Sequence, residues 1–202
     1  MEEKYLNDIS EIKNMMSKSS QFISLSGLAG ILAGFYALIG AFIANDLLNN
    51  HVGYYVTLES YTFKMIVFTA TTVLFLSIIT AVLLTFNKAK KVGENVWNTS
   101  SKRMITNFLI PLFTGGIFSM LLLRQEIYGL IAPVTLIFYG LACVNASKYT
   151  FRDVRYLGIT ITILGLISTE LSGYSLEFWA LGFGVCHILY GSIMYFKYDY
   201  KK

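Results

Sequence analysis

Six apolar stretches, each about long enough to cross a bilayer, occupy most of this 202-residue chain. They run over Phe22–Ala44, Met65–Phe86, Met104–Leu123, Ile127–Ala146, Val154–Leu171 and Phe178–Phe196. A helix needs roughly 20 apolar residues to cross the ~30 Å hydrocarbon core. Because lipid offers no hydrogen-bond partners, each backbone amide must be satisfied within its own helix. The sequence therefore predicts an all-α polytopic membrane protein, with six transmembrane helices arranged as three successive hairpins.

The composition favours one membrane domain without a separate soluble domain. Charged residues make up 14% of the chain, against about 25% in a typical soluble domain. We expect residues 22–197 to form the transmembrane domain, between a cytoplasmic helix over 1–21 and a short tail over 198–202. The first apolar run is too long for the core of a signal peptide, so we expect it to remain as a mature helix.

Basic residues are concentrated on one side of the expected membrane. Fourteen of the 16 lysines and arginines precede the first stretch, follow the sixth, or flank the two loops that join stretches two to three and four to five. Only Lys64 and Arg124 lie on the other side. The positive-inside rule then puts both termini in the cytoplasm. Because topology accounts for the basic flanks, we expect the lipid bilayer and not nucleic acid as their partner.

The segment before the first stretch has the pattern of an amphipathic helix. Tyr5, Ile9, Ile12 and Met16 recur at helical spacing among charged residues. Such a helix could lie on the membrane surface, extend the first span, or pair with a helix of another protein. It is the first candidate for a protein contact.

The first stretch carries an unusual surface of small residues. The residues on it are Ser26, Gly30 and Gly34 in one row and Ala33, Ala37 and Ala41 in the adjoining row. Rows of this kind let two helix backbones approach closely. The contact could lie within one subunit or between subunits, so this surface is also a candidate for a homo-oligomer or for a membrane protein partner.

A weak internal repeat links the later stretches. Leu130, Val134, Ile137, Tyr139 and Gly140 recur 51 positions later as Leu181, Val185, Ile188, Tyr190 and Gly191. Gly115 and Ile117 likewise recur 50 positions later as Gly165 and Ile167, whereas the second stretch has no Tyr-Gly pair. We infer three related hairpins, of which the first has diverged.

Four segments carry a resemblance to a known group of membrane proteins. They are Ser24–Gly30, Phe35–Gly40, Leu109–Phe118, and Leu136–Leu141 through Asn145–Tyr149. Together they resemble an uncharacterised six-span integral membrane protein family of Bacteroidetes-type bacteria, over nearly the whole chain. The resemblance implies a location in the inner membrane of a bacterium and a regulatory or envelope-stress setting, and it supplies no catalytic residue. The three-hairpin pattern is similar, more weakly, to the small six-helix membrane family associated with acid resistance in enteric bacteria.

His187 is the one ionisable residue well inside a stretch. Polar groups at that depth are costly and usually face the bundle interior. His187 could act as a proton switch, because its ordinary pKa lies near neutrality, or it could be a neutral side chain bonded to a neighbouring helix. Glu170, at the outer end of stretch five, could be a vestibule carboxylate for a cation or proton, or a solvated helix end.

Other polar residues in the stretches favour packing roles. Interhelical hydrogen bonds are expected for Asn107 and Asn145. The threonines of stretch two could bond within the bundle or line a polar pore. Cys143 and Cys186 both lie inside stretches, which predicts buried thiols without a disulfide. No residue spacing, including that of the loop 45–61, matches a recognised metal or cofactor site.

No catalytic motif is present: the chain has no nucleophile elbow, HExxH pair, phosphate loop or dinucleotide fingerprint. We therefore expect a non-enzymatic protein without catalytic residues or cofactors. The first hypothesis is an interaction, sensing or regulatory component of an envelope process, acting through its N-terminal helix and the loop Asn87–Arg103. The alternative is a small channel or transporter for a neutral or weakly acidic solute, built around His187 and the hydroxyl-rich second stretch.

Overall fold

The computed structural model describes residues 21–49 and 58–200, and within these ranges every regular element is a helix. The α-helices are α2 (Gly27–Asn49), α3 (Tyr61–Val92), α4 (Thr99–Arg124), α5 (Ile131–Ala146), α6 (Asp153–Glu170), α7 (Ser175–Trp179) and α8 (Cys186–Met194). Short 3₁₀ turns, η1 (Tyr128–Leu130) and η2 (Ser172–Tyr174), lead into α5 and α7. Two π-helical segments, η3 (Ala180–Val185) and η4 (Tyr195–Asp199), precede and follow α8. The expected amphipathic helix of 1–21 lies outside the described residues apart from its last residue.

Five helical segments are long and apolar enough to cross a membrane, which indicates a membrane protein. They are α2, α3, α4, Tyr128–Ala146 and Ser175–Asp199. α6 is not among them, because its 18 residues include Asp153, Arg155 and Glu170. The all-helical class is therefore confirmed, and the sixth span stays a prediction.

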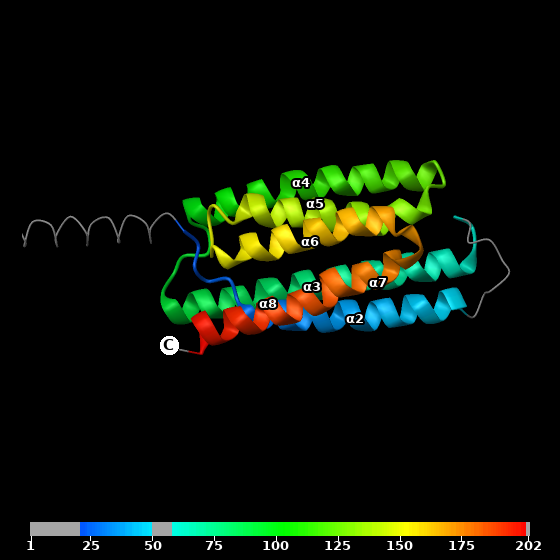
Figure 1. The fold of residues 1–202 in the computed structure, drawn as a ribbon. Helices are drawn as coiled ribbons and strands as arrows, with labels where there is room; N and C mark the ends of the chain where they lie inside the picture. Colours follow the sequence, from blue (N-terminus) through cyan, green and yellow to red (C-terminus); the bar gives the residue numbers. More distant parts are fainter. Residues whose placement is uncertain (1–20, 50–57, 201–202) are drawn as a thin grey trace, which may run out of the picture.

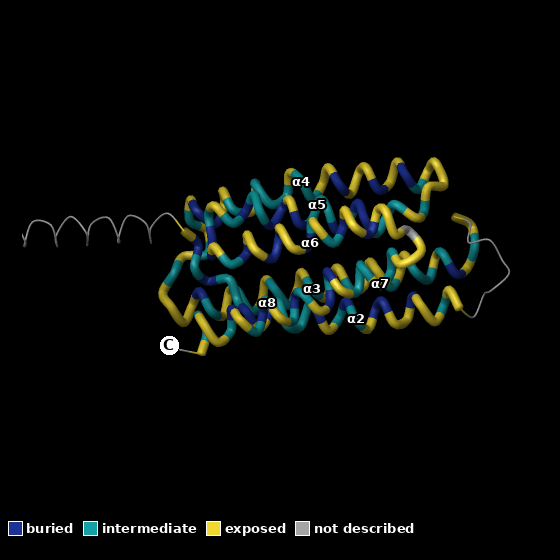
Figure 2. The backbone as a smooth tube through the Cα atoms, viewed as in Figure 1, coloured by how far each residue is buried: buried dark blue, intermediate teal, exposed yellow. Residues whose placement is uncertain are grey.

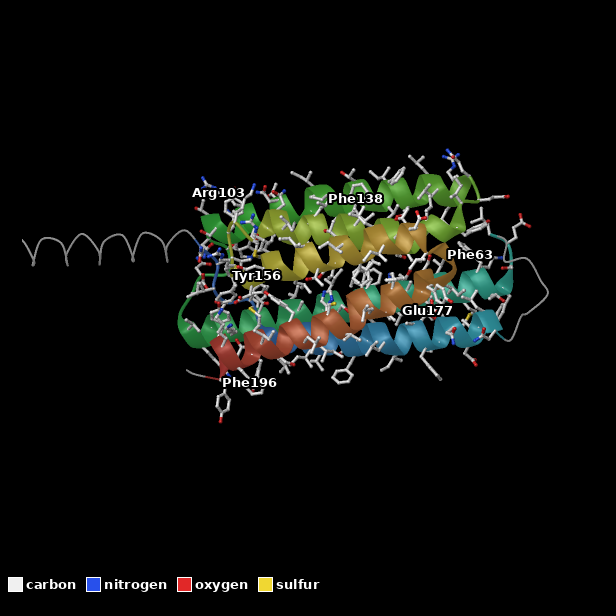
Figure 3. The ribbon with its side chains drawn as sticks, viewed as in Figure 1. Phe63, Arg103, Phe138, Tyr156, Glu177 and Phe196 are labelled. Atoms are coloured by element: carbon white, nitrogen blue, oxygen red, sulfur yellow. The ribbon has the colours of Figure 1, made fainter. Side chains whose placement is uncertain are left out.

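The helices form three antiparallel hairpins, α2–α3, α4–α5 and α6 with the α7–α8 segment (Figure 1). Neighbouring helices follow the order α3, α2, α8, α6, α5, α4, so α3 and α4 lie at the two ends of the array. We use "basic end" for the end of the bundle that holds residues 21–26, the loops 93–98 and 147–152, and η4. Arg103 lies at this end, and Phe63 and Glu177 lie toward the opposite end (Figure 3).

The first span begins later than the sequence indicates. Residues 21–26 are not helical, and α2 begins at Gly27. The backbone N–H of Phe22 donates to the Tyr149 carbonyl at 2.8 Å, and the Phe22 carbonyl accepts from Thr150 Oγ1 at 2.8 Å. The expected helix start at Phe22, and the place of Ser26 in a helical row, are therefore corrected. This segment bonds to the loop after α5, a partner that local periodicity does not reveal.

Side-chain caps and a glycine define the ends of the α3–α4 connection. Ser60 Oγ accepts from the backbone of Phe63 at the start of α3, and Asn98 Oδ1 accepts from Ser101 N at 2.7 Å at the start of α4. α3 ends at Gly93, whose φ of 70° suits the left-handed helix terminus that glycine favours. At roughly 1.5 Å per residue, the 32 residues of α3 reach about 48 Å, so its basic last turns extend beyond an apolar core of ~30 Å.

Pro111 lies inside α4 and Pro133 in the first turn of α5, and a side chain of a neighbouring helix bonds to the carbonyl four residues before each. Proline lacks an N–H, which leaves the carbonyl four residues earlier without its helical donor. The carbonyl freed by Pro111 belongs to Asn107, and it accepts from Asn145 Nδ2 of α5 at 3.0 Å. The carbonyl four residues before Pro133 accepts from Ser175 Oγ at 3.2 Å. Each proline therefore favours a polar contact between helices.

Glycines set the closest helix crossings. Between α2 and α8, a Cβ on Gly34 would lie 2.6 Å from the Gly184 carbonyl oxygen, and one on Gly191 would lie 2.5 Å from a backbone nitrogen of α2. Between α5 and α6, a Cβ on Gly158 would lie 2.6 Å from the Gly140 carbonyl oxygen. The backbones therefore touch where only glycine fits. The small-residue surface of the first span could pack within one subunit or between subunits, and the glycines of α2 pack within the chain.

These crossings follow the internal repeat. Gly140 of the second hairpin packs on α6 of the third, and its counterpart Gly191 packs on α2 of the first. α3 has no such glycine and buries only Thr62 and Ala89 among its 32 residues (Figure 2). The third hairpin thus packs tightly against both the second hairpin and the first hairpin. The remaining side, between α3 and α4, is named the α3–α4 seam.

Candidate functional site

His187 is buried at the start of α8, and protein atoms engage both of its ring nitrogens. Nε2 lies 2.7 Å from the Tyr139 hydroxyl, and Nδ1 lies 3.0 Å from the Gly182 carbonyl oxygen. A carbonyl only accepts, so Nδ1 carries the proton. In a neutral imidazole, Nε2 then accepts from the hydroxyl of Tyr139. The two contacts together select one tautomer and one ring orientation.

The π-helical turn before α8 brings the Gly182 carbonyl to the histidine. Gly182 lies in η3, five residues before His187. The wider π turn relates residues five apart, which suits a contact between this carbonyl and the histidine ring. Gly182 also admits the Leu136 side chain of α5, because a Cβ there would lie 2.5 Å from Leu136 Cδ2. The same glycine therefore serves the contact between α5 and η3.

Aromatic rings enclose the His187–Tyr139 pair. The Phe183 ring stacks beside His187 with centroids 5.9 Å apart, and the Phe108 ring meets Tyr139 edge-on at 5.8 Å. Trp179 lies 4.9 Å from Phe183 in turn. No charged side chain in the described part of the chain hydrogen-bonds to His187. The site is thus an aromatic box around one neutral hydrogen-bonded pair.

Tyr190, the repeat counterpart of Tyr139, has a different environment. Its hydroxyl is buried and has no hydrogen-bond partner in the described part of the chain. The hydroxyl of Ser168 on α6 is likewise buried and has no hydrogen-bond partner among the described residues. The repeat therefore places two similar tyrosines in the bundle, of which one is bonded and the other is not.

A second polar cluster joins the two ends of the described chain at the basic end. Asp199 accepts from the backbone N–H of Gly27 at 2.9 Å and pairs with Lys88 at 2.5 Å. Lys88 also donates to the Leu25 carbonyl at 2.8 Å. The first N–H groups of a helix lack internal partners and attract negative charge. Asp199 therefore caps α2 from a position 172 residues away.

Further contacts extend this cluster across the basic end. Ser24 donates to Glu94, which also accepts from Asn98 Nδ2 at 3.2 Å. The Phe151 and Tyr198 rings stack with centroids 4.0 Å apart. Residues 21–26, the α3–α4 loop and η4 are thereby held together by polar and aromatic contacts.

Asp153 closes the third hairpin at the same end. Its carboxylate accepts from Lys197 Nζ at 2.9 Å and from the Tyr198 hydroxyl at 2.7 Å. Partial burial raises the pKa of Asp153, but the hydrogen bonds from Lys197 and Tyr198 and the charge of Lys197 outweigh it and hold the pKa below its ordinary value. Asp153 is therefore a carboxylate whose charged form is stabilised by the fold.

The remaining sequence candidates lie apart from His187. Glu170 is the exposed last residue of α6, toward the opposite end of the bundle. Asn145 makes the expected interhelical bond, to the carbonyl of Asn107. The Asn107 amide instead donates to the Arg103 carbonyl of its own helix at 2.8 Å. The interhelical bond expected for that side chain is therefore corrected to a bond within α4.

Threonine and cysteine side chains occupy packing positions. Thr69, Thr71 and Thr72 each donate to the carbonyl four residues earlier in α3. Cys143 is buried and Cys186 half-buried, and neither forms a disulfide. Within residues 21–49 and 58–200, no group of three histidine, cysteine or acidic side chains is placed to hold a metal ion. Much of the loop 45–61 lies outside these ranges.

Sequence patterns did not identify the pairing of Lys88 with Asp199 or of His187 with Tyr139. Lys88 is one of several lysines that topology alone explains, and Asp199 follows the last apolar stretch without a motif. The one available signal was the repeat, which marks Tyr139 and Tyr190 as related positions. It does not say which tyrosine meets a histidine, because helix packing decides that.

Comparisons with protein-family models, curated proteins and solved structures found no match to this chain. Proposals about its function therefore rest on its own residues and their contacts.

Proposed function

We propose that this chain is a non-enzymatic bacterial inner-membrane protein with six spans and cytoplasmic termini, which acts as an interaction, sensing or regulatory component of an envelope process. α6 supports the sixth span, because it packs along α5 and its charged residues, Asp153, Arg155 and Glu170, lie at its two ends. Among the described basic residues, only Lys64 and Arg124 lie toward the opposite end, which supports the orientation.

The observation that carries the proposal is the contrast between the α3–α4 seam and the two glycine-packed sides. α3 packs mainly against α2 and exposes large apolar side chains along its length. Phe68 and Phe75 of α3 are 65% and 60% exposed, and Phe113 of α4 is 65% exposed. Lipid can cover such side chains. At the two other junctions between hairpins, however, a helix of the neighbouring hairpin packs closely. We therefore propose that a helix of another membrane protein packs in the seam.

The alternative, a small channel or transporter, has less support. Both ring nitrogens of His187 already engage protein atoms. The hydroxyls of Thr69, Thr71 and Thr72 bond back to their own helix. The two features that favoured a polar path through the bundle therefore have protein partners.

Site-specific photo-crosslinking from the exposed face of α3, which borders the seam, tests the proposal. Benzoylphenylalanine is placed at Phe75 in the full chain, in cells that contain the native membrane. After irradiation we expect a discrete adduct with one other membrane protein, identified by mass spectrometry. The control places the same group at Leu189, which is 60% exposed on α8 outside the seam, and we expect no adduct there.

Purification in mild detergent gives the second measurement, through the mass and composition of the intact complex. A stoichiometric foreign protein that is lost in Phe75→Trp supports the exposed face of α3 as part of the interface. An adduct only with a second copy of the chain, or equal adducts from Phe75 and Leu189, contradicts the proposal. In that case, flux assays in liposomes at varied pH become the next step.

A further inference from the structure

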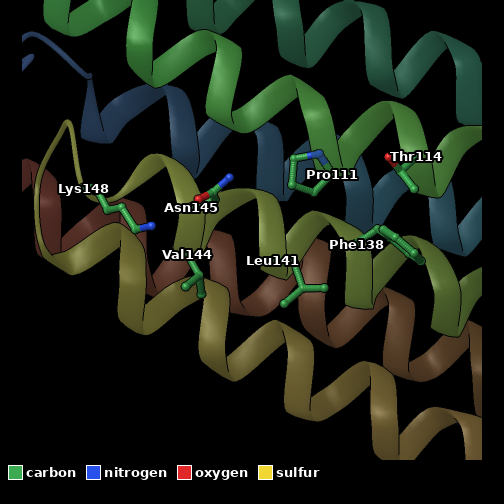
Figure 4. A pocket seen from close by; sticks show the side chains of 7 residues that line it. All are labelled: Pro111, Thr114, Phe138, Leu141, Val144, Asn145 and Lys148. Carbon is green, nitrogen blue, oxygen red and sulfur yellow. The ribbon is translucent and has the colours of Figure 1, made fainter.

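A groove of about 420 Å³, open along one side, runs between α4 and α5 (Figure 4). It is lined by Pro111 and Thr114 of α4 and by Phe138, Leu141, Val144, Asn145 and Lys148 of α5 and the residues just after it. The groove is separate from the His187 site, and none of its lining residues hydrogen-bonds to His187. Its lining is apolar along most of its length and ends at a lysine.

Protein atoms accept hydrogen bonds from two polar side chains in the wall of the groove. Asn145 Nδ2 donates to the Asn107 carbonyl that Pro111 leaves free, at 3.0 Å. Thr114 Oγ1 donates to the Ile110 carbonyl at 2.8 Å. What remains for a ligand is a mostly apolar surface with the side-chain oxygen of Asn145 and the ammonium group of Lys148. This combination does not suit a polar solute, but it suits a molecule with an apolar chain and an anionic head.

The length of the groove matches half of a bilayer. From Phe138 to Lys148 is ten residues of α5 and its extension, or roughly 15 Å at 1.5 Å per residue. The hydrocarbon core is ~30 Å thick, so one leaflet is about 15 Å. Phe138 lies near the middle of the Tyr128–Ala146 span, and Lys148 lies just beyond its end. The groove therefore covers the depth that one acyl chain occupies in one leaflet.

Two cations stand at the basic end of the groove, one on each wall helix. Lys148 follows α5, and Arg103 lies on the same face of α4 as Asn107 and Pro111, at successive spacings of four residues. Both side chains are exposed, and neither is in an ion pair with any residue of 21–49 or 58–200. Guanidinium and ammonium groups at such a mouth bind phosphate oxygens well.

We infer that this groove binds an anionic phospholipid, with one acyl chain along the apolar wall between Pro111 and Leu141 and the phosphate between Lys148 and Arg103. Basic pockets between membrane helices on the cytoplasmic side are suited to such head groups. The inference is independent of the partner proposed for the α3–α4 seam. The crosslinking experiment and the lipid experiment can therefore fail separately.

Lipid retention by the intact protein tests the inference. The full chain is reconstituted in nanodiscs of phosphatidylcholine with increasing phosphatidylglycerol, and native mass spectrometry counts the lipids that stay bound. We expect one phosphatidylglycerol molecule to be retained in preference to phosphatidylcholine. In Lys148→Gln and in Arg103→Gln its apparent affinity should fall about fivefold each, the effect of removing one basic residue near a membrane surface.

The matched control is Lys102→Gln. Lys102 is exposed, adjacent to Arg103 and of the same charge, but it points about 100° away around α4. We expect no change in retention for this variant. An equal loss in Lys102→Gln and Lys148→Gln would mean that the lipid responds only to the general positive charge of the basic end, and would overturn the inference.

A second variant fills the groove without changing the charge. Leu141 is 43% exposed in the groove wall, so Leu141→Trp can occupy the groove without entering the core. We expect it to abolish preferential retention while the thermal unfolding midpoint stays close to that of the parent chain. Retention that survives Leu141→Trp would overturn the acyl-chain part of the inference.

A soluble head group separates a lipid site from a simple anion site. Glycerol 3-phosphate carries the phosphate chemistry without acyl chains. We expect it not to displace phosphatidylglycerol at millimolar concentration. Displacement by glycerol 3-phosphate to the same extent as by added phosphatidylglycerol would show a soluble-anion site and overturn the inference.

Discussion

At the scale of single residues, the most informative comparison is between Tyr139 and Tyr190. They are 51 positions apart in the repeat and both lie in the bundle interior. Tyr139 donates to His187 Nε2, whereas the Tyr190 hydroxyl is buried without a partner among the described residues. A buried hydrogen bond contributes only modestly to stability, but a buried polar atom left without a partner is costly. The same chemical change should therefore have opposite effects at the two sites.

We expect Tyr139→Phe to destabilise the protein by about 1–3 kcal/mol, because it leaves Nε2 of His187 buried without a donor. Tyr190→Phe should be neutral or stabilising by up to about 1 kcal/mol, because it removes a hydroxyl that has no partner among the described residues. Thermal or denaturant unfolding of the purified variants in one detergent measures both. Equal losses of stability in the two variants would contradict this assignment of the hydrogen bonds.

At the scale of helices, contact between backbones decides which hairpins meet. Gly191 of α8 and Gly140 of α5 each lie against another helix so closely that a methyl group would reach backbone atoms. Gly116 of α4 is exposed, and a Cβ added there would meet no other described atom within 4 Å. In a helix interior, glycine is less favourable than alanine by about 1 kcal/mol. The close helix contacts therefore offset the cost of a helical glycine at Gly191 and Gly140, whereas Gly116 has no such contact among the described residues.

Gly191→Ala should lower stability by about 1–3 kcal/mol, the usual range for overpacking a tight contact, because the new methyl group would separate α2 from α8. Gly116→Ala should raise stability by up to about 1 kcal/mol through helix propensity alone. Unfolding midpoints of the two single variants give the comparison. If Gly191→Ala were as stable as the parent chain, close contact between the α2 and α8 backbones would be ruled out as the force that joins these hairpins.

At the scale of the whole molecule, the basic end closes the chain on itself. Asp199, near the C-terminus, caps α2 at Gly27 and pairs with Lys88 of α3. Asp153 at the start of α6 binds Lys197 and Tyr198 of η4. The Asp199 cluster therefore holds the first and third hairpins together at this end by charge as well as by glycine packing, and the Asp153 cluster closes the third hairpin.

The Asp153 cluster predicts an acid-sensitive contribution to stability. The folded state holds the pKa of Asp153 below its ordinary value, which is about 3.9 for an unfolded chain. The stabilisation is therefore complete above about pH 3.9 and is lost as the pH falls through the lower, folded-state value. Because Lys197 is half exposed, the effect is small.

Unfolding midpoints of the parent chain and of Asp153→Asn, measured from about pH 6 down to about pH 3, test this contribution. We expect the difference in stability between the two proteins to shrink at the acid end of the range. Asp153→Asn removes the titrating group, whereas the exposed Glu170 serves as a matched control when changed to Gln. A difference that is constant with pH would contradict the role of the Asp153 carboxylate.

The apolar stretches and small-residue spacing were sufficient to predict the helical class and close packing by Gly30 and Gly34. Of the six expected spans, the structure bears out five by length and composition. These properties depend on residues near one another in the chain, because apolar length and small-residue spacing decide them within a single helix. The depth of His187 was also visible, since it follows from its position in the last apolar stretch.

Only the tertiary structure decided which partners those residues meet. The start of α2 at Gly27 depends on Tyr149 and Thr150, and the hydrogen bond at Nε2 of His187 depends on Tyr139 of another hairpin. The freed carbonyl of Asn107 is likewise satisfied from α5. Pairings of this kind join residues tens to hundreds of positions apart, and they follow from how whole helices pack rather than from any local pattern. The chain by itself determined which segments are helical and apolar, and helix packing determined where its polar groups find partners.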